Sequence, residues 1–486
     1  MKRMKKLTIY IICMLLICSS CEDQLTEVPK NFISNVNFWR NAEDAEAGVR
    51  GMYRVDLVDP FDEQFLELHT DYAKGRGSWA PLSIWQSPMA NAEIQRAATY
   101  FWNRPYQIVN IANTVLENIP RIDMNEDRKK VLLAEARFLR AMQYFILVRG
   151  FGPIPLRLNA TADLTSIDAP RASVDEVYAA ILDDLAIAEA DLPVTQGTDT
   201  RRPTNWAAKM LMAQVYLTRE NWSLAAAKAE EVIKSGRFSI IPVKTSNDFY
   251  NIFAKRPTTE DVLSIHYSST IPDSYVLTLH MANVPVYNNG SQGFFTTVPN
   301  TNSIIGASWD VADLRKNFNL YTQYVSNTGA IVKLPATTPI LFKKIIAQPD
   351  GIRSNARYLL RFTENYLIFA EAAAMDAGTP TAQALEYLNV VRRRAYGLDP
   401  FAPSAVDYPS GMSITDFRNA VLLERAYEFI NEQRRWWDLR RTGKVKEAIG
   451  AAFGVTVHDS RELWPIPQDE INNNGALSQA DQNPGY

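Results

Sequence analysis

Two clusters of aromatic and polar side chains have the residue types needed to bind a ligand. The first occupies residues 71–85, with the sequence DYAKGRGSWAPLSIW, and combines rings, an arginine and a carboxylate on a glycine-containing loop. The second contains Tyr287, Asn288, Asn289, Phe294, Phe295 and Trp309. Flat rings can stack on the apolar face of a pyranose, while amides, carboxylates and arginines bond its hydroxyls. The two clusters thus offer the residue types that sugar binding would require.

We assign a role to each candidate in these clusters. The predicted ligand-binding residues are Asp71, Tyr72, Arg76, Trp79, Trp85, Tyr287 and Trp309. In this prediction the two tryptophans of the first cluster supply stacking, its aspartate and arginine supply hydrogen bonds, and Tyr287 or Trp309 closes the opposite side of the ligand. The alternative is that each tryptophan anchors its loop to a helical scaffold, and the sequence leaves both interpretations open.

Catalytic arrangements find little support. The histidines, at positions 69, 266, 280 and 458, are far apart and lack the i, i+4 spacing of a helical ligand pair, so we predict no metal centre. Adjacent carboxylates such as Asp183 and Asp184 point in different directions on a helix. We therefore predict a protein that is not an enzyme and needs no cofactor. A glycoside hydrolase, with two carboxyls facing across a sugar, is a less favoured alternative, and a structural calcium ion stays an open question.

The run RRWWDLRR at residues 434–441 resembles an anion site with stacking rings, but a packing role is favoured. We expect Trp436, Trp437 and Leu439 to pack the last helix. Asp438 is expected to pair with nearby arginines or to cap a turn. Glu135 and Glu371 lie in alanine-rich helices, and we expect them also to be partners of arginines rather than catalytic acids.

The first residues have the order of a secretory signal. A basic cluster at residues 2–6 precedes an apolar run at residues 7–17, and two serines lie directly before Cys21. A cysteine at this position is what a lipoprotein signal peptidase requires, so we predict a cleaved signal at 1–20, lipidation of Cys21, and a leash at 21–35. The alternative is an ordinary secretory signal with an incidental cysteine. We predict that a lipid anchors the protein in the outer membrane and that the protein faces the cell exterior.

Composition describes the rest of the chain as a large soluble body. The whole chain has a formal net charge of −3 and a hydrophobic fraction of 47%, and this charge does not suggest nucleic acid as a partner. Cleavage would remove Cys13 and Cys18, so no disulfide is expected in the mature protein.

Helical periodicity dominates this body. Apolar residues recur at spacings of three and four through 131–148, and glycines and prolines at 150–155 are expected to end that helix. Helices with small residues at regular places come in pairs, most clearly at 206–233 and 366–391, and the pattern is tetratricopeptide-like. Further pairs are predicted at 100–149 and at 414–441. Such pairs must stack to bury their apolar faces.

The predicted fold is mainly α, with tetratricopeptide-like helix pairs packed against an irregular, loop-rich half with a few short strands. We expect a single domain at 36–486. Its helical scaffold spans about 36–236 and 356–486, and a loop-rich insertion of Thr, Ser, Asn, Pro and Gly spans about 237–355, with one strand near 262–267. Rigid elements commonly present binding loops, so the insertion is expected to carry much of the recognition surface.

Three stretches together resemble the SusD/RagB family of outer-membrane lipoproteins from Bacteroidetes-type bacteria. They are AEARFLRAMQYFILVRGFGPIPL at 134–156, the helices within 361–395, and a C-terminal part with ERAYEFINEQRRWWDLRRTG at 424–443, LWPIPQDEINNN at 463–474 and QNPGY at 482–486. The resemblance spans nearly the whole chain, and the order of the stretches behind a lipoprotein signal is specific.

The resemblance implies a surface protein that captures oligosaccharides and delivers them to a SusC-like TonB-dependent outer-membrane transporter. It also implies a fold of tetratricopeptide-like helix pairs against a loop-rich half. Some members resemble peptide binders, so capture of peptides for the same kind of transporter is the alternative function.

Overall fold

The computed structural model describes residues 38–53, 65–88, 92–161, 168–197, 199–253, 257–267, 296–299, 303–306, 308–326, 328–344 and 356–486. Helices dominate this part of the chain, which confirms the mainly α fold. Predictions that concern Cys21, Tyr287, and the signal and leash at 1–35 lie outside the described residues.

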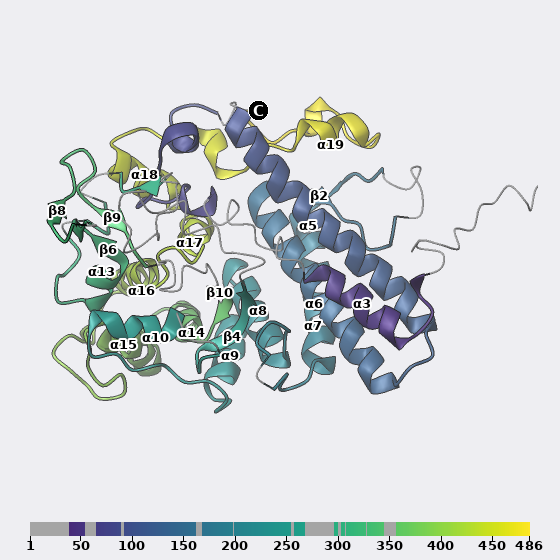
Figure 1. Ribbon diagram of the computed structural model, residues 1–486, viewed down its shortest axis with the longest axis horizontal. Coiled ribbons are helices and arrows are strands. Elements are labelled where there is room, and N and C mark those ends of the chain that lie inside the picture. Colours follow the sequence, from purple (N-terminus) through teal and green to yellow (C-terminus); the bar gives the residue numbers. More distant parts are fainter. Residues whose placement is uncertain are drawn as a thin grey trace, which may run out of the picture.

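The longer helices fall in two groups along the chain (Figure 1). The first group is α3 (Ala42–Met52), α5 (Ala92–Asn118), α6 (Glu126–Phe151), α7 (Val174–Asp191), α8 (Asn205–Thr218) and α9 (Trp222–Ile233). The second is α14 (Thr363–Ala377), α15 (Ala382–Ala395), α16 (Ile414–Glu428), α17 (Arg435–Arg441), α18 (Val445–Phe453) and α19 (Gln468–Asn473). The elements between the groups, from η4 (Ser246–Phe249) and α10 (Tyr250–Phe253) to β9, are short.

The two clearest helix pairs of the sequence are present. Helix α8 packs on α9, α14 packs on α15, and α9 packs on α14, so that one pair stacks on the other. Left-handed residues make the turns tight: Glu220 has φ 56° before α9, and Gly378 has φ 68° at the end of α14. Ala213, Ala225, Ala229 and Ala372 are buried between these helices. Small side chains therefore let the helices approach closely, as their spacing indicates.

The remaining pairs show where sequence boundaries were inaccurate. Helix α5 packs on α6 but begins at Ala92 rather than near 100, and α16 ends at Glu428, where Asn431 follows with φ 56°. Helix α7, which packs against both α6 and α8, was not among the predicted pairs. Helix α6 ends at Phe151 with Gly152 at φ 74°. Gly150, by contrast, is needed for close packing, because a Cβ there would lie 2.6 Å from the ring of Trp464.

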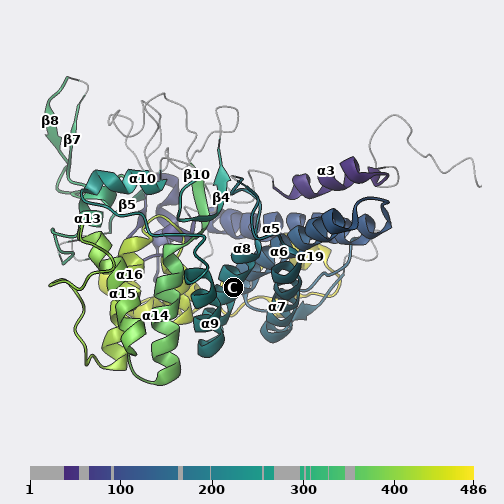
Figure 2. The ribbon, with the colours of Figure 1, turned by 90° about the horizontal axis from the view of Figure 1, so that it is seen from below.

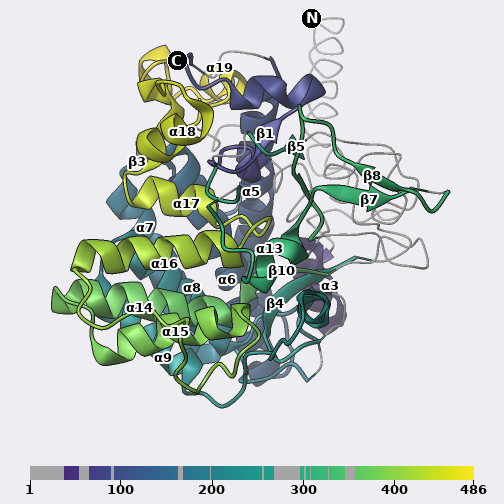
Figure 3. The same ribbon diagram turned by 90° about the vertical axis from the view of Figure 1, so that its left-hand side faces the viewer.

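Strands are short and form two-stranded antiparallel sheets. The pairs are β1 (Lys74–Gly75) with β5 (Thr296–Thr297), β2 (Ile154–Pro155) with β3 (Arg171–Ala172), β4 (Asp261–His266) with β10 (Ala356–Arg361), β6 (Leu320–Tyr321) with β9 (Leu341–Phe342), and β7 (Gln323–Val325) with β8 (Ile331–Lys333). The strand expected near 262–267 is β4. Figure 3 shows α14 to α17 on one side and β4, β5, β7, β8 and β10 on the other, while β7 and β8 stand out from the body in Figure 2.

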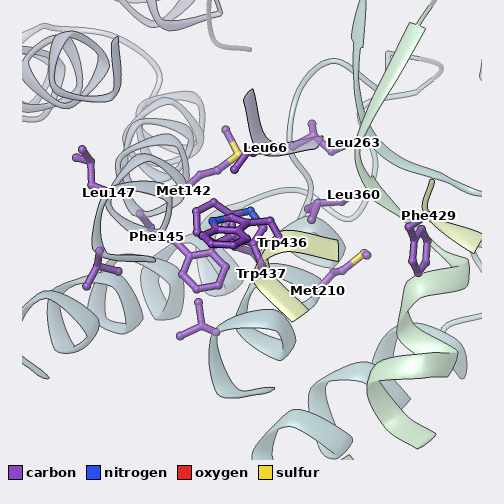
Figure 4. Close-up of a cluster of buried hydrophobic side chains, with 14 of the residues drawn as sticks. Leu66, Met142, Phe145, Leu147, Met210, Leu263, Leu360, Phe429, Trp436 and Trp437 are labelled. Carbon is purple, nitrogen blue, oxygen red and sulfur yellow. The ribbon is translucent and has the colours of Figure 1, made fainter. Parts of the chain in front are cut away.

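The core joins both parts of the molecule. Figure 4 shows Met142 and Phe145 of α6 near Trp436 and Trp437 of α17, with Leu263 and Leu360 of the β4–β10 pair beside them. Trp436, Trp437 and Leu439 are all buried, at 0%, 7% and 1% exposure. The run at 434–441 is therefore a packing element, as predicted.

None of the helices in the described part of the chain combines the length and apolar character needed to cross a lipid bilayer.

The predicted acid partners of arginines are also confirmed. Asp438 lies 2.7 Å from Arg425, and Glu371 lies 2.5 Å from Arg441. Glu135 lies 2.8 Å from Arg202. All three carboxylates are buried, and each is matched by a guanidinium, which is what a buried charge requires. These acids hold helices together.

A larger buried ion network connects the helices to the strands. Glu428 of α16 lies 2.8 Å from Arg361 of β10 and 2.5 Å from Arg394 of α15. Arg394 and Arg361 also contact Glu260, which directly precedes β4, at 2.5 and 3.1 Å. Arg315 of α13 (Leu314–Asn319) reaches Glu428 at 3.4 Å. One carboxylate thus ties three elements from separate parts of the chain.

Candidate functional site

The short β1–β5 sheet pairs the first candidate cluster with two threonines of the insertion. Lys74 of the first segment is paired with Thr297, and Gly75 with Thr296, directly after the stretch that contains the second cluster. The carbonyl of Lys74 also accepts a hydrogen bond from the Thr297 hydroxyl at 3.4 Å. Figure 3 shows β1 and β5 side by side. We call the surface formed by β1, β5 and η2 (Gly77–Ser83) the β1–β5 face.

The tight fold of the first segment determines which of its side chains reach solvent. A Cβ at Gly75 would lie 2.0 Å from the Trp79 carbonyl oxygen, so only glycine fits there, and the Gly75 amide donates to Ser83 Oγ at 2.8 Å. Lys74, Arg76 and Ser78 are exposed as a result. Trp79 faces inward and is 5% exposed.

Trp85 is part of the core. It is 0% exposed, with ring centroids of His69 at 5.7 Å and Trp436 at 6.4 Å, and the Arg461 guanidinium lies 4.6 Å from its ring centroid. Because protein covers its ring, it presents no face to a sugar in this structure. Trp79 and Trp85 therefore take the anchoring role, the second interpretation that the sequence left open.

The polar members of the first cluster are also engaged by protein. Asp71 is 1% exposed and accepts hydrogen bonds from Arg435 at 2.9 and 2.8 Å. Tyr72 is 0% exposed, and its hydroxyl donates to Glu67. These contacts connect the segment before β1 to the loop and helix at 433–441, which explains their burial. The side chains of Asp71 and Tyr72 therefore lie in the protein interior, where they support the β1–β5 face and do not project from it.

Trp309 takes a comparable place in the insertion. Its ring stacks on Tyr427 at 4.2 Å with an interplanar angle of 4°, and its Nε1 donates to Asp313 at 2.9 Å. At 1% exposure it attaches the insertion to α16 and does not close over a ligand. Ligand contact by Arg76 and Tyr287 stays a prediction, since Arg76 is exposed and Tyr287 lies outside the described residues.

A pocket of about 250 Å³ is lined in part by Asp71, which precedes β1 in the chain. Asp71 and Arg435 contribute to its wall, together with Lys444, Glu447 and Ser303. The Ser303 hydroxyl is buried without a hydrogen-bond partner among the described residues. The pocket thus combines an ion pair, an unsatisfied hydroxyl and two charged side chains, which together can bond hydroxyl groups.

Sequence reasoning missed several residues of this site. Lys74 and Thr297 become neighbours only through the β1–β5 pairing, and Asp71 and Arg435 are 364 positions apart. The only available signal for Arg435 was the charged run at 434–441, which also fits packing. Within the described residues no group of three or more His, Cys, Asp or Glu side chains could hold a metal ion.

The carboxyl of Glu67 is buried in the segment before β1. Burial raises the pKa of Glu67 to about 7, although hydrogen bonds from Tyr72 and the Gln433 amide oppose the shift. The backbone N–H of Gln433 donates a hydrogen bond to the Glu67 carboxyl at 2.7 Å, and Gln433 has φ 61°. The Glu67 carboxyl therefore connects this left-handed turn to the segment before β1. The folded state therefore holds a proton that the unfolded state has lost.

The Glu67→Gln variant is expected to change the pH dependence of stability. A raised folded pKa means that stability falls as pH rises from about 4.3 to about 7, and that the loss is complete above that range. The wild type should lose about 2–3 kcal/mol more than the variant between pH 5 and pH 8. Urea titrations at both pH values measure it. Equal pH slopes would contradict the assignment, and exposed Glu447→Gln is the control.

Comparisons with known proteins identify the class. One family model, described as starch-binding associating with outer membrane, matches residues 46–217, and a second, the SusD family, matches residues 280–486. The chain belongs to the SusD/RagB family. Proteins of this family associate with the outer membrane.

Relatives resemble the chain along its whole length. SusD-like protein P2 from Formosa agariphila is 28% identical over 99% of this chain and 100% of the relative. A crystal structure of a SusD homolog from Bacteroides thetaiotaomicron is 25% identical with a TM-score of 0.76, covering 93% of this chain and 98% of that one. A laminarin binding SusD-like protein, 23% identical over 92% of this chain and 100% of that one, has the same fold at a TM-score of 0.73.

Proposed function

We propose that this protein is a glycan-binding lipoprotein of the cell surface that captures oligosaccharides and delivers them to a SusC-like TonB-dependent transporter. Membership of the SusD/RagB family along nearly the whole chain carries the proposal. Similar folds include a laminarin binding protein and a surface glycan-binding protein A from Bacteroides fluxus, and binding of carbohydrate is what these relatives share.

The proposed glycan site is the β1–β5 face with its adjoining pocket. Lys74, Arg76 and Ser78 are exposed there, and each can bond sugar hydroxyls. The Asp71–Arg435 pair at the pocket wall accepts and donates as well. The site holds polar groups on a rigid support of buried tryptophans, which is favourable because a preorganised site loses little entropy on binding. Tyr287 is proposed as the ring that closes it.

Anchoring and transport form the second half of the proposal. Diacylglycerol on Cys21, with an N-acyl chain, would hold the protein in the outer membrane with more lipid than the two signals that stable attachment needs. Residues 21–35 would then serve as the leash to a body that begins at about residue 36. The transporter would receive the glycan from the β1–β5 face.

Calorimetric titration tests the function. The mature chain from residue 22 would be titrated with a panel of plant, host and fungal oligosaccharides that includes laminarin and maltoheptaose, and release of reducing ends would be assayed in parallel. Saturable binding without hydrolysis is expected. If no oligosaccharide of the panel binds, the proposal of glycan capture is wrong and peptide cargo is favoured. Release of reducing ends would establish a glycoside hydrolase.

The double variant Lys74→Ala/Arg76→Ala is expected to weaken glycan binding at least about tenfold, because hydrogen bonds from charged donors contribute about 1.5–3 kcal/mol each. Stability should be unchanged, since both side chains are exposed. Calorimetry with the glycan that binds best measures the effect. Arg121→Ala, an arginine that is 68% exposed on η3 (Ile119–Arg121), is the matched control. Unchanged affinity in the double variant would remove this site.

A further inference from the structure

A second polar pocket is separate from the one that Asp71 and Arg435 line. It has a volume of about 240 Å³ and is formed by the middle of α5, residues 157–161 and α19. Its lining residues are all different from those of the pocket beside the β1–β5 face. Figure 1 shows α5 and α19 to the right of α16, α17 and α18, the helices that line the first pocket. The two pockets therefore belong to different surfaces.

Two buried asparagines build the wall of this pocket. Asn113 is 2% exposed and donates from Nδ2 to the carbonyls of Arg157 and Asn159, both at 2.9 Å. Asn474 is 3% exposed and bonds both backbone groups of Ala169, at 2.9 and 3.1 Å. These bonds fix irregular backbone on both sides, so the shape of the pocket is set before a ligand arrives.

Three further asparagines of the lining can still form hydrogen bonds with a ligand. Within the described part of the chain, the side-chain amides of Asn159 and Asn473 have no hydrogen-bond partner, and that of Asn110 uses only its oxygen, which accepts from the Thr161 amide at 3.3 Å. An amide offers donors and an acceptor together, as a sugar hydroxyl does. Three such groups around one pocket match a ligand with several neighbouring hydroxyls.

The charges of the pocket exclude a preference for anions. The one guanidinium in the lining, Arg157, lies 3.0 Å from Glu470, so its charge is compensated. Arg157 also lies over the ring of Tyr106 at 5.2 Å, and Tyr106 with Val109 supplies the apolar part of the lining. A neutral ligand loses no charge–solvent interaction here, whereas an anion would meet Glu470.

We propose that this pocket is a second binding site for a neutral saccharide unit. The ligand class rests on the proposed function, but the site is separate from the β1–β5 face. Its size suits one end or one unit of a chain, not a long oligosaccharide, because ligand sites usually measure about 300–1,000 Å³. Two sites on one rigid body would raise the affinity for a polymer above that of either site, through effective concentration.

Hydrogen–deuterium exchange with laminarin and maltoheptaose as probes tests the proposal. Amides of α19 and of residues 157–161 should gain protection, in the wild type and also in Lys74→Ala/Arg76→Ala. The variant Asn110→Ala/Asn473→Ala should abolish that protection and lower polymer affinity about tenfold, since the hydrogen bonds of two side-chain amides to the sugar are lost. The control is Asn103→Ala/Asn472→Ala on the same two helices, whose residues lie outside the pocket.

The outcomes separate the two proposals. Protection at β1 and β5 without protection at α19 would overturn the second site and leave the proposed function intact. No protection anywhere would overturn both. Equal loss of polymer affinity in the Asn110→Ala/Asn473→Ala variant and its control would also overturn the second site, because only the former removes pocket amides.

Discussion

Replacing Glu428 by glutamine is expected to lower the free energy of unfolding by about 3–5 kcal/mol, the usual cost of removing one partner from a buried ion pair. The Glu428 carboxylate is 2% exposed and lies within 3.4 Å of Arg315, Arg361 and Arg394. Glutamine keeps the size of the side chain but leaves these guanidiniums with less compensating charge in the core. Urea unfolding at pH 7 measures the difference.

Acid should reduce that difference. Burial alone would raise the pKa of Glu428, but Arg394, Arg361 and Arg315 hold it well below its usual range. A depressed folded pKa stabilises fully above the unfolded value of about 4.3, and this stabilisation is lost as pH falls further. The difference between the wild type and Glu428→Gln should therefore shrink progressively as the pH falls below about 4.

A surface carboxylate supplies the control. Glu386 pairs with Arg393 at 2.7 Å on α15, but its side chain is 44% exposed, so Glu386→Gln should cost about 0–1 kcal/mol. Equal costs in the two variants would show that the network around Glu428 does not hold the helices to the strands. A change at Glu428 without pH dependence would contradict the depressed pKa.

The helical part of this fold was predictable because its signals are local. The alanines of α8, α9 and α14 recur at helical spacing, and Glu135, Glu371 and Asp438 stand near arginines in helices that must pack. Boundaries were less accurate: α16 ends at Glu428, before the boundary expected at 431, and the left-handed Asn431 lies in the turn that follows.

The site was predictable only in outline. Composition indicated two clusters, and the β1–β5 pairing connects the first of them to Thr296 and Thr297 of the insertion. Which rings face solvent depends on contacts with remote residues, since Trp309 stacks on Tyr427 and Trp85 packs near Trp436. A loop that contains a tryptophan has the same sequence whether the ring binds a ligand or packs in the core, so the sequence alone cannot assign the role of the ring. The asparagine pocket likewise requires α5 and α19 to meet.

Trp85→Ala separates packing from binding with a large effect. We expect it to lower the free energy of unfolding by about 3–5 kcal/mol, because Trp85 is 0% exposed and its removal leaves a cavity among His69, Trp436 and Arg461. Thermal and urea unfolding measure this loss. Glycan affinity per folded molecule, measured by calorimetry, should stay unchanged within about twofold, which corresponds to under about 0.5 kcal/mol.

Trp85→Phe is the matched variant. Trp85 Nε1 is buried without a hydrogen-bond partner among the described residues, so phenylalanine gives up no hydrogen bond and should cost less than alanine. The reverse pattern, loss of glycan binding in Trp85→Ala with stability retained, would mean that the ring is accessible and stacks on the ligand. If the Trp85 ring packs in the core, the Trp85→Ala variant loses stability and keeps its glycan affinity. If the ring binds the sugar, the variant loses affinity and keeps its stability.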